Sequence, residues 1–179
     1  MSDHGQIEPR APGEIVSAAA TVDARNAIKI EELITIDRPR DELFQIWRNF
    51  ERLPSYADDL ESVTALGDGR THWVARVPGG KRIEWDSEMI NEIPGELIAW
   101  KTVGNPDVAH AGSVHFRETP RGATEVRVIV DYEPPGGRLS GLVHAFTKVF
   151  GQSPEQKIRA DLEKFKERVE SGRPRLADR

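Results

Sequence analysis

The stretch between residues 60 and 133 constrains the fold most, because it alternates short apolar segments with turn signals at close intervals. Four such signals are Asp68-Gly69, Pro78-Gly79-Gly80, Pro94-Gly95 and Arg121-Gly122. Links this short cannot cross over a sheet, so neighbouring segments must pair antiparallel. The pattern predicts six strands, at residues 60–67, 70–77, 81–93, 96–103, 109–119 and 123–133.

Residues 27–56 add one more strand and two short helices. Isoleucine occupies alternate positions of the first part, at Ile28, Ile30, Ile34 and Ile36. Such alternation is typical of a half-buried strand. After Pro39, apolar residues recur at helical spacing to about Asn49, and Pro54 separates this helix from a second short turn or helix. We therefore expect seven antiparallel strands, with two short helices after the first strand.

The chain returns to helical periodicity after the Pro-Pro-Gly-Gly sequence at residues 134–137. One apolar stripe covers residues 139–150, and a second runs from Ile158 to Val169. Between the stripes Ser153 stands as an N-cap, with Pro154 at the first helical position and Gln156 at the third. A C-terminal helix is therefore predicted with a break or bend near Gly151–Pro154, and whether the two stripes form one continuous helix stays open.

The length of 179 residues suits one domain with tails. Residues 1–26 mix glycine and proline with small or charged residues, so we expect a flexible N-terminal arm. The patterned residues 27–171 form the predicted domain. Residues 172–179 carry no apolar pattern and are expected to fray.

The cost of burying charge decides which face of the predicted strands points inward. On strand 81–93, Ile83, Trp85, Ser87 and Met89 alternate with Arg82, Glu84, Asp86 and Glu88. Burying three carboxylates is costly, whereas burying the Trp85 ring removes about 150–250 Å² from water. The Trp85 face is therefore the inner one. The C-terminal helical stripe is expected to cover it, with Trp47 and Phe50 of the early helix closing one end.

Several segments carry a resemblance to a known family. They are Trp85-Asp86-Ser87-Glu88, Ile98-Ala99-Trp100-Lys101, Ala111-Gly112-Ser113-Val114-His115-Phe116 and Phe150-Gly151-Gln152-Ser153-Pro154-Glu155. With the order of elements, they resemble the START-like (SRPBCC) superfamily, and within it the bacterial polyketide cyclase/dehydrase and coenzyme Q-binding branch. The resemblance covers about residues 27–171. It implies an α+β helix-grip fold, in which the sheet curves around the C-terminal helix and leaves a cavity for an apolar ligand.

The resemblance and the inward aromatic rings together predict a set of ligand-binding residues. The set is Trp47, Phe50, Trp73, Trp85, Ser87, Met89, Trp100, Phe116, Tyr132 and Phe146. A place in a filled core is the usual reading for any single aromatic residue, and the resemblance favours a cavity for the set as a whole. For Ser87, we favour a hydrogen bond to a backbone carbonyl over one to a ligand carbonyl.

No residue is assigned a catalytic role from the sequence. His115 with Ser113 and Arg117 is the most suggestive polar trio, because a neutral imidazole beside an arginine can accept a proton. However, Val114 and Phe116 occupy the predicted inner face, which sends His115 outward as an exposed surface residue. His72 and His110 lie near strand ends.

Motifs and composition exclude several classes of partner. The sequence has no cysteine, no HExxH and no glycine-rich nucleotide loop, so we expect neither a metal nor a cofactor. A net charge of -5 without a dense basic run argues against nucleic acid. No apolar run reaches the roughly 20 residues needed to cross a bilayer, so no stable membrane insertion is expected. Without a secretory signal, the expected location is cytoplasmic; the oligomeric state stays open.

Three functions remain open at this point. The leading hypothesis is binding of a lipophilic small molecule, a polyketide, quinone or lipid-like compound, between the sheet and the C-terminal helix. The first alternative is a polyketide cyclase/aromatase or dehydratase acting on such a ligand, which requires a buried histidine, arginine or tyrosine facing the cavity. The second alternative is a protein-interaction module without ligand, which would present a large exposed apolar patch.

Overall fold

The computed structural model describes residues 27–76, 79–106, 109–133 and 153–172. Its elements are β1 (Ile28–Ile36), α1 (Arg40–Arg48), the 3₁₀ helix η1 (Phe50–Ser55), β2 (Leu60–Gly67), β3 (Arg70–Arg76), β4 (Arg82–Ile93), β5 (Leu97–Val103), β6 (Ala109–Glu118), β7 (Thr124–Glu133) and α3 (Pro154–Ser171). The stripe predicted at 139–150, the arm at 1–26 and residues 173–179 lie outside the described residues.

The seven strands form one antiparallel sheet in the order β1-β7-β6-β5-β4-β3-β2. The predicted fold class is confirmed, and the six strands predicted after β1 agree with the observed bounds to within one residue at each end. The turn signals account for this accuracy, because each of them ends one strand and starts the next. Strands β2 to β7 each pair with the next strand in the chain. The exception is β1, which pairs with β7 at the other end of this meander.

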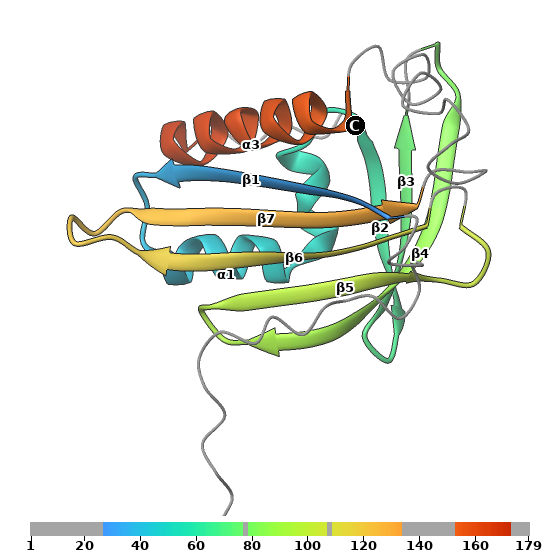
Figure 1. Cartoon of the computed structure of the whole chain (residues 1–179), viewed down its shortest axis with the longest axis horizontal. Coiled ribbons are helices and arrows are strands. Elements are labelled where there is room, and N and C mark those ends of the chain that lie inside the picture. The colour runs from blue at the N-terminus through green and yellow to red at the C-terminus, as the bar shows by residue number, and fades with distance from the viewer. Residues whose placement is uncertain (1–26, 77–78, 107–108, 134–152, 173–179) are drawn as a thin grey trace, which may run out of the picture.

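The sheet is strongly curved, as in a helix-grip fold. Figure 1 shows β2 and β3 running steeply across the direction of β5, β6 and β7, with α3 lying along β1. The pairing of β4 with β5 shifts register between Met89 and Asn91. A bulge of this kind increases the local bend and twist of a strand, so it accounts for part of the curvature.

Helix α1 fills one end of the concave side. Its Leu43 and Phe44 are buried, and the Phe44 ring meets Phe116 of β6 edge to face, with 5.7 Å between the ring centroids. Ile36, Val114 and Val126 complete this packing with no exposed surface. This end of the molecule is a solid hydrophobic core.

Helix α3 covers the other part of the concave side. It starts at the predicted capping box: the Gln156 backbone N–H donates to Ser153 Oγ at 3.3 Å, and the Ser153 backbone N–H donates to Gln156 Oε1 at 3.1 Å. Leu162, Phe165 and Val169 form its buried face. None of the helices within the described residues is both long and apolar enough to span a bilayer.

Candidate ligand-binding site

A cavity of about 370 Å³ lies between the sheet, the segment from η1 to β2, and α3. Its wall is lined by Trp47, Leu53, Tyr56, Ala57, Asp59, Leu60, Trp73, Ala75, Arg76, Ile83, Trp85, Ser87, Trp100, His110, Val128, Val130, Lys157, Ile158, Asp161, Leu162 and Phe165. This volume lies within the usual range of about 300–1,000 Å³ for pockets that hold one small molecule. The lining is mostly apolar, with a few polar groups at defined places.

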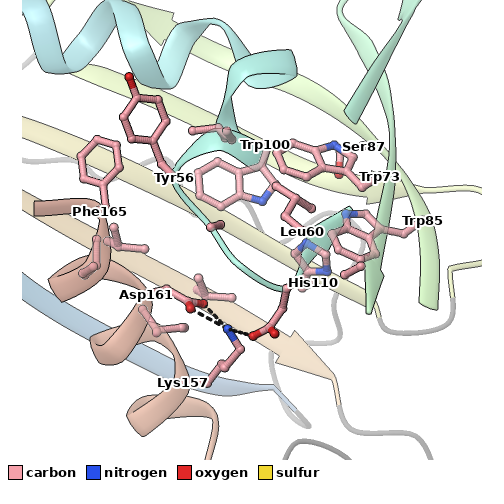
Figure 2. A pocket seen from close by; sticks show the side chains of 18 of the residues that line it. Tyr56, Leu60, Trp73, Trp85, Ser87, Trp100, His110, Lys157, Asp161 and Phe165 are labelled. Atoms are coloured by element: carbon pink, nitrogen blue, oxygen red, sulfur yellow. Dashed lines mark hydrogen bonds and ion pairs between the residues drawn. The ribbon is translucent and has the colours of Figure 1, made fainter. Parts of the chain in front are cut away.

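Indole rings form much of the wall, and all four tryptophans of the chain belong to it. Figure 2 shows Trp73, Trp85 and Trp100 on the sheet side of the cavity, facing Phe165 of α3. Trp73 and Trp85 are stacked, with ring centroids 5.9 Å apart and an angle of 11° between their planes. Such flat apolar surfaces suit the face of a planar ligand.

Trp100 takes its place because the neighbouring strand carries glycine opposite it. Gly112 pairs with Trp100 across β5 and β6. A Cβ at Gly112 would lie 2.6 Å from Trp100 Cζ2 and 2.9 Å from the Ile129 carbonyl oxygen. The indole therefore lies flat on β6 only because position 112 has no side chain.

The structure places the ten predicted residues in three groups. Trp47, Trp73, Trp85, Ser87 and Trp100 line the cavity, while Phe146 lies outside the described residues. The other four, Phe50, Met89, Phe116 and Tyr132, are buried or partly buried but do not line it. Phe50, for example, lies behind the wall, with its ring centroid 5.5 Å from that of Trp73.

Ser87 is the notable polar group of the wall. It is 2% exposed, and its hydroxyl has no hydrogen-bond partner among the described residues. The bond to a backbone carbonyl that we favoured from sequence is therefore not found there. Trp47 Nε1, on another part of the wall, is also buried without a partner within the described ranges. Arg40 Nε, Thr119 Oγ1 and Arg168 Nη1 are unpartnered elsewhere in the described residues. The two groups at the cavity differ from them because they belong to residues of the wall, which makes them candidates for ligand contact.

His110 is a wall residue that sequence reasoning missed. Its ring meets Trp85 edge to face, with 5.5 Å between the ring centroids, and Figure 2 shows it among the indoles. The alternation of side chains along β6 predicts this position, because His110 lies an even number of residues from Val114 and Phe116 and so points to the same inner face. The sequence analysis considered His110 only as a residue near a strand end and did not apply the alternation to it.

His115 lies on the outer face of the sheet, as its parity predicts, but it is half-buried rather than exposed. Its Nε2 lies 3.0 Å from Ser113 Oγ. Burial, together with the nearby charge of Arg127, lowers the pKa of the His115 imidazole below its ordinary value. This pair has no access to the cavity and is not part of its wall.

A partly buried ion cluster forms the polar side of the cavity. The Lys157 ammonium lies 2.6 and 2.5 Å from the two carboxylate oxygens of Asp161 and 2.9 Å from Asp59 Oδ2. Burial lowers the pKa of Lys157, but the two carboxylates outweigh that effect, so its pKa lies above the ordinary value. Burial raises the pKa of Asp161. The cluster joins the start of α3 to the segment before β2.

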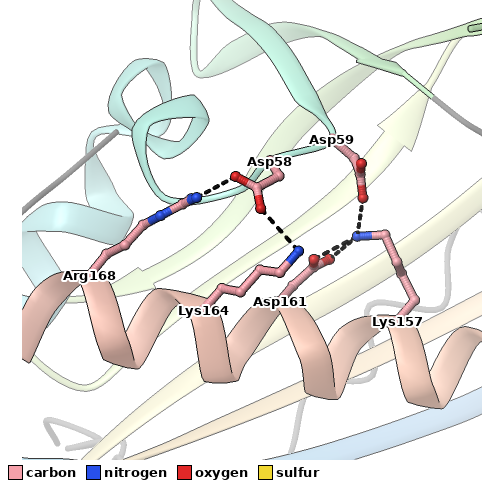
Figure 3. Close-up of polar contacts among 6 residues, drawn as sticks. All are labelled: Asp58, Asp59, Lys157, Asp161, Lys164 and Arg168. Atoms are coloured by element: carbon pink, nitrogen blue, oxygen red, sulfur yellow. Dashed lines mark hydrogen bonds and ion pairs between the residues drawn. The ribbon is translucent and has the colours of Figure 1, made fainter. Parts of the chain in front are cut away.

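A second ion cluster continues this joint along α3, as Figure 3 shows. Asp58 accepts from Lys164 Nζ at 3.0 Å and from the Arg168 guanidinium. Hydrogen bonds from Arg168 and Lys164 lower the pKa of Asp58 to about 2. Asp58 and Asp59 thus hold the η1–β2 segment onto α3 over the cavity. Sequence reasoning missed both clusters, because their partners are about a hundred residues apart along the chain.

The cavity wall carries few groups that can take part in a chemical reaction. The described residues contain no group of three or more histidine, cysteine, aspartate or glutamate side chains arranged to hold a metal ion. The neutral wall groups that can donate or accept a hydrogen bond include the imidazole of His110, the hydroxyls of Tyr56 and Ser87 and the indole N–H of Trp47. The charged groups of the wall are those of Asp59, Arg76, Lys157 and Asp161.

Comparison with known families places this architecture. Residues 27–170 match the family described as polyketide cyclase / dehydrase and lipid transport. The chain belongs to this family. A curated relative is an uncharacterized 17.2 kDa protein of Streptomyces lincolnensis, 32% identical over 147 residues that cover 79% of this chain and 89% of the relative. The resemblance found in the sequence is thereby confirmed at the level of the family.

Solved structures agree with this assignment. DR_A0006 from Deinococcus radiodurans is 30% identical and superposes with a TM-score of 0.62, covering 81% of this chain and 98% of that one. A START superfamily protein from Mycobacterium smegmatis, 11% identical, superposes with a TM-score of 0.60, covering 80% of this chain and 97% of that one. At that identity the second likeness shows the fold alone, which is the START-like helix grip.

Proposed function

We propose that the protein binds one lipophilic small molecule, a polyketide, quinone or lipid-like compound, in the cavity between the sheet and α3. The observation that carries the proposal is the cavity of about 370 Å³ whose wall combines four indole rings with an unpartnered buried hydroxyl. A filled core would bury these rings against each other and leave no such volume. The family, whose description includes lipid transport, supports the same function.

The energetics of the cavity suit binding of moderate affinity. A ligand that buries about 300 Å² of apolar surface gains roughly 7 kcal/mol before the cost of association. After that cost, affinities near the micromolar range are expected unless polar groups contribute. The unpartnered groups of Ser87 and Trp47 at the wall can supply such contributions.

The test is a thermal-shift panel of quinones, phenols and lipids, combined with native mass spectrometry of the purified protein. Ala75 lines the cavity, so Ala75→Leu fills part of it. Ala65 is exposed on β2 and does not line it, so Ala65→Leu is the matched control. We expect a panel compound at 100 times its Kd to stabilise the wild type and A65L by about 2.7 kcal/mol, and A75L much less.

Two results would overturn this proposal. One is a panel in which no compound raises the Tm of the wild type and no small molecule accompanies the purified protein. The other is equal stabilisation of A75L and A65L, which would place the binding outside the cavity.

A second candidate function, cyclisation/aromatisation or dehydration of a polyketide-like compound, is favoured by His110. Its imidazole lies at the wall beside Trp85, where it can move a proton to or from a bound carbonyl compound. The test is His110→Phe, which keeps a flat ring at the wall. An enzyme that uses His110 would keep its ligand affinity and lose product formation by about 100-fold or more. Unchanged turnover in H110F would remove His110 from the reaction, and no turnover in the wild type would leave binding alone.

The third function, a protein-interaction module, gains no support from the described surface. Its exposed large apolar side chains are Leu33, Leu66, Ile90 and Ile93. Leu33 and Leu66 lie on β1 and β2, the two opposite edges of the sheet. Leu33 and Leu66 therefore lie on separate edges, and the other two exposed side chains, Ile90 and Ile93, lie on β4.

A further inference from the structure

The cavity wall carries several polar groups, of which the Arg76 guanidinium is paired with Glu61. Two of the remaining places for the polar end of a ligand differ in whether their hydrogen-bonding groups are already used. One place is the ammonium of Lys157 on α3. The other is the hydroxyl of Ser87 on β4, on the sheet side of the cavity (Figure 2). Lys157 would select an anion such as a fatty-acid carboxylate, whereas Ser87 would select a neutral carbonyl or hydroxyl oxygen.

The Lys157 ammonium is already satisfied by the protein. It has three N–H donors, and three carboxylate oxygens of Asp161 and Asp59 lie within 2.9 Å of it. One positive and two negative charges leave the cluster with a net charge of -1. An anionic ligand would have to displace a carboxylate from Lys157 and approach this negative charge. The cluster therefore disfavours an anion at this side of the cavity.

The surroundings of Ser87 leave its hydroxyl for a ligand. Thr71 and Thr102 flank it on the neighbouring strands. The Thr71 hydroxyl accepts from Trp73 Nε1 at 2.8 Å, and the Thr102 hydroxyl accepts from the His110 backbone N–H at 3.1 Å. Both neighbours are thus engaged, while Ser87 Oγ is buried without a partner among the described residues.

The second orphan points to the same ligand chemistry. Trp47 Nε1 is buried at the cavity wall, again without a partner in the described part of the chain. An indole N–H can only donate, so it needs an acceptor atom. An oxygen atom on the ligand satisfies a group of this kind, whereas a pure hydrocarbon leaves it unsatisfied.

We propose, as a refinement that rests on the proposed function, that the ligand is a neutral ring compound whose carbonyl or hydroxyl oxygen hydrogen-bonds to Ser87. Ser87 is then the residue that selects for an oxygenated ligand, and the Lys157 cluster selects against anions. The ring system follows from the stacked indoles of Trp73 and Trp85, which present flat apolar walls.

Three probes of nearly equal shape test this selection. They are 2-acetonaphthone, which carries a neutral carbonyl, 2-ethylnaphthalene, which has no oxygen, and 2-naphthoate, which is an anion. Calorimetric titration of the full chain gives a Kd for each probe. We expect the ketone to bind about ten-fold more tightly than the hydrocarbon, which corresponds to one hydrogen bond of about 1.4 kcal/mol, and the carboxylate to bind most weakly.

The variant Ser87→Ala removes only the hydroxyl. It should weaken binding of 2-acetonaphthone about ten-fold and change the Kd of 2-ethylnaphthalene less than two-fold. Ser62→Ala is the matched control, because Ser62 lies on β2 and does not line the cavity. The hydrocarbon titration doubles as a folding control for S87A, since a misfolded cavity would lose this probe as well.

The outcomes separate this inference from the proposed function. Equal affinities for the ketone and the hydrocarbon, or a ketone affinity that S87A does not change, would overturn the role of Ser87 while the cavity still binds. Tighter binding of 2-naphthoate than of the ketone would overturn the exclusion of anions. Failure of all three probes, together with failure of the wider ligand panel, would overturn the proposed function and this inference with it.

Discussion

The concave face of the sheet has two halves, which share the strands β5, β6 and β7 but are covered by different helices. β5, β6 and β7 each have one end in solid core and the other at the cavity. Ile98, Phe116 and Val126 are almost fully buried at the α1 end. On the same faces of the same strands, Trp100, His110 and Val130 line the cavity. The alternation of side chains is identical in both halves, so the strands themselves do not determine where the hollow lies.

The difference arises from the covering elements. Helix α1 places Phe44 directly against Phe116 and fills its half. Helix α3 is joined to the η1–β2 segment by ion pairs to Asp58 and Asp59. Its Phe165 contacts Trp47, with 5.6 Å between the ring centroids, and the cavity lies between α3 and the sheet. In this molecule the covering elements, and not the strand pattern, therefore determine where the sheet borders a cavity.

The largest loss of stability is expected in the half of the concave face that α1 fills. Phe116→Ala should lower the free energy of unfolding by about 3–5 kcal/mol, because it leaves a void in rigid core. Trp85→Ala removes a larger ring but faces space that is already open, so it should cost about 2 kcal/mol or less. Urea unfolding of both variants measures the difference. Equal losses would mean that the two halves are packed alike.

An intermediate loss of stability is expected at Gly112, at the boundary between the two halves. Gly112→Ala places a methyl group 2.6 Å from Trp100 Cζ2 and 2.9 Å from the Ile129 carbonyl oxygen, so both the indole and the backbone of β7 must shift. Overpacking of this kind should lower the free energy of unfolding by about 1–3 kcal/mol. The additional loss of ligand binding, followed by thermal shift, would show that Trp100 forms the wall. A variant with unchanged stability and binding would show that the wall adapts freely.

The smallest loss of stability is expected at the ion pairs that join Asp58 to α3. The pKa of the Asp58 carboxyl is lowered to about 2, so its ion pairs stabilise the fold at pH values above about 4, and this contribution is lost as the pH falls towards 2. Because the side chain is 38% exposed, solvent screening limits the contribution to about 1 kcal/mol or less.

The variant Asp58→Asn tests the contribution of these ion pairs. It should be less stable than the wild type at pH 7, and the difference should shrink as the pH is lowered from 4. Urea unfolding at several pH values measures it, and added salt should reduce it. A difference that stays constant with pH would assign the effect to lost packing rather than to charge.

The sequence predicted the frame of the molecule closely, because its signals are local. Turn residues such as Pro94-Gly95 end one strand and begin the next, and Ser153 with Gln156 marks the start of α3 within four residues. Alternation assigned the inner face of β4 from the cost of burying its carboxylates, and Ser87 is indeed buried on that face. Each of these inferences needed only a short stretch of chain.

The extent of the cavity could not be predicted in the same way, because it depends on contacts between distant segments. Periodicity gave Phe116 and Trp100 the same inward orientation, but not the covering helix that each of them meets. The clusters around Lys157 and Asp58 join residues about a hundred positions apart, and no local pattern indicates them. Whether the Ser87 hydroxyl has a partner also depends on three neighbouring strands at once.

The position of every tryptophan on the cavity wall has a practical consequence. Since the chain has four tryptophans and all of them line this one space, its intrinsic ultraviolet emission comes almost entirely from the cavity wall. Any guest that enters changes the surroundings of the emitters directly, without a label or an engineered reporter. Binding of a ligand as proposed above is therefore expected to change the tryptophan fluorescence, which would give its rates of association and dissociation.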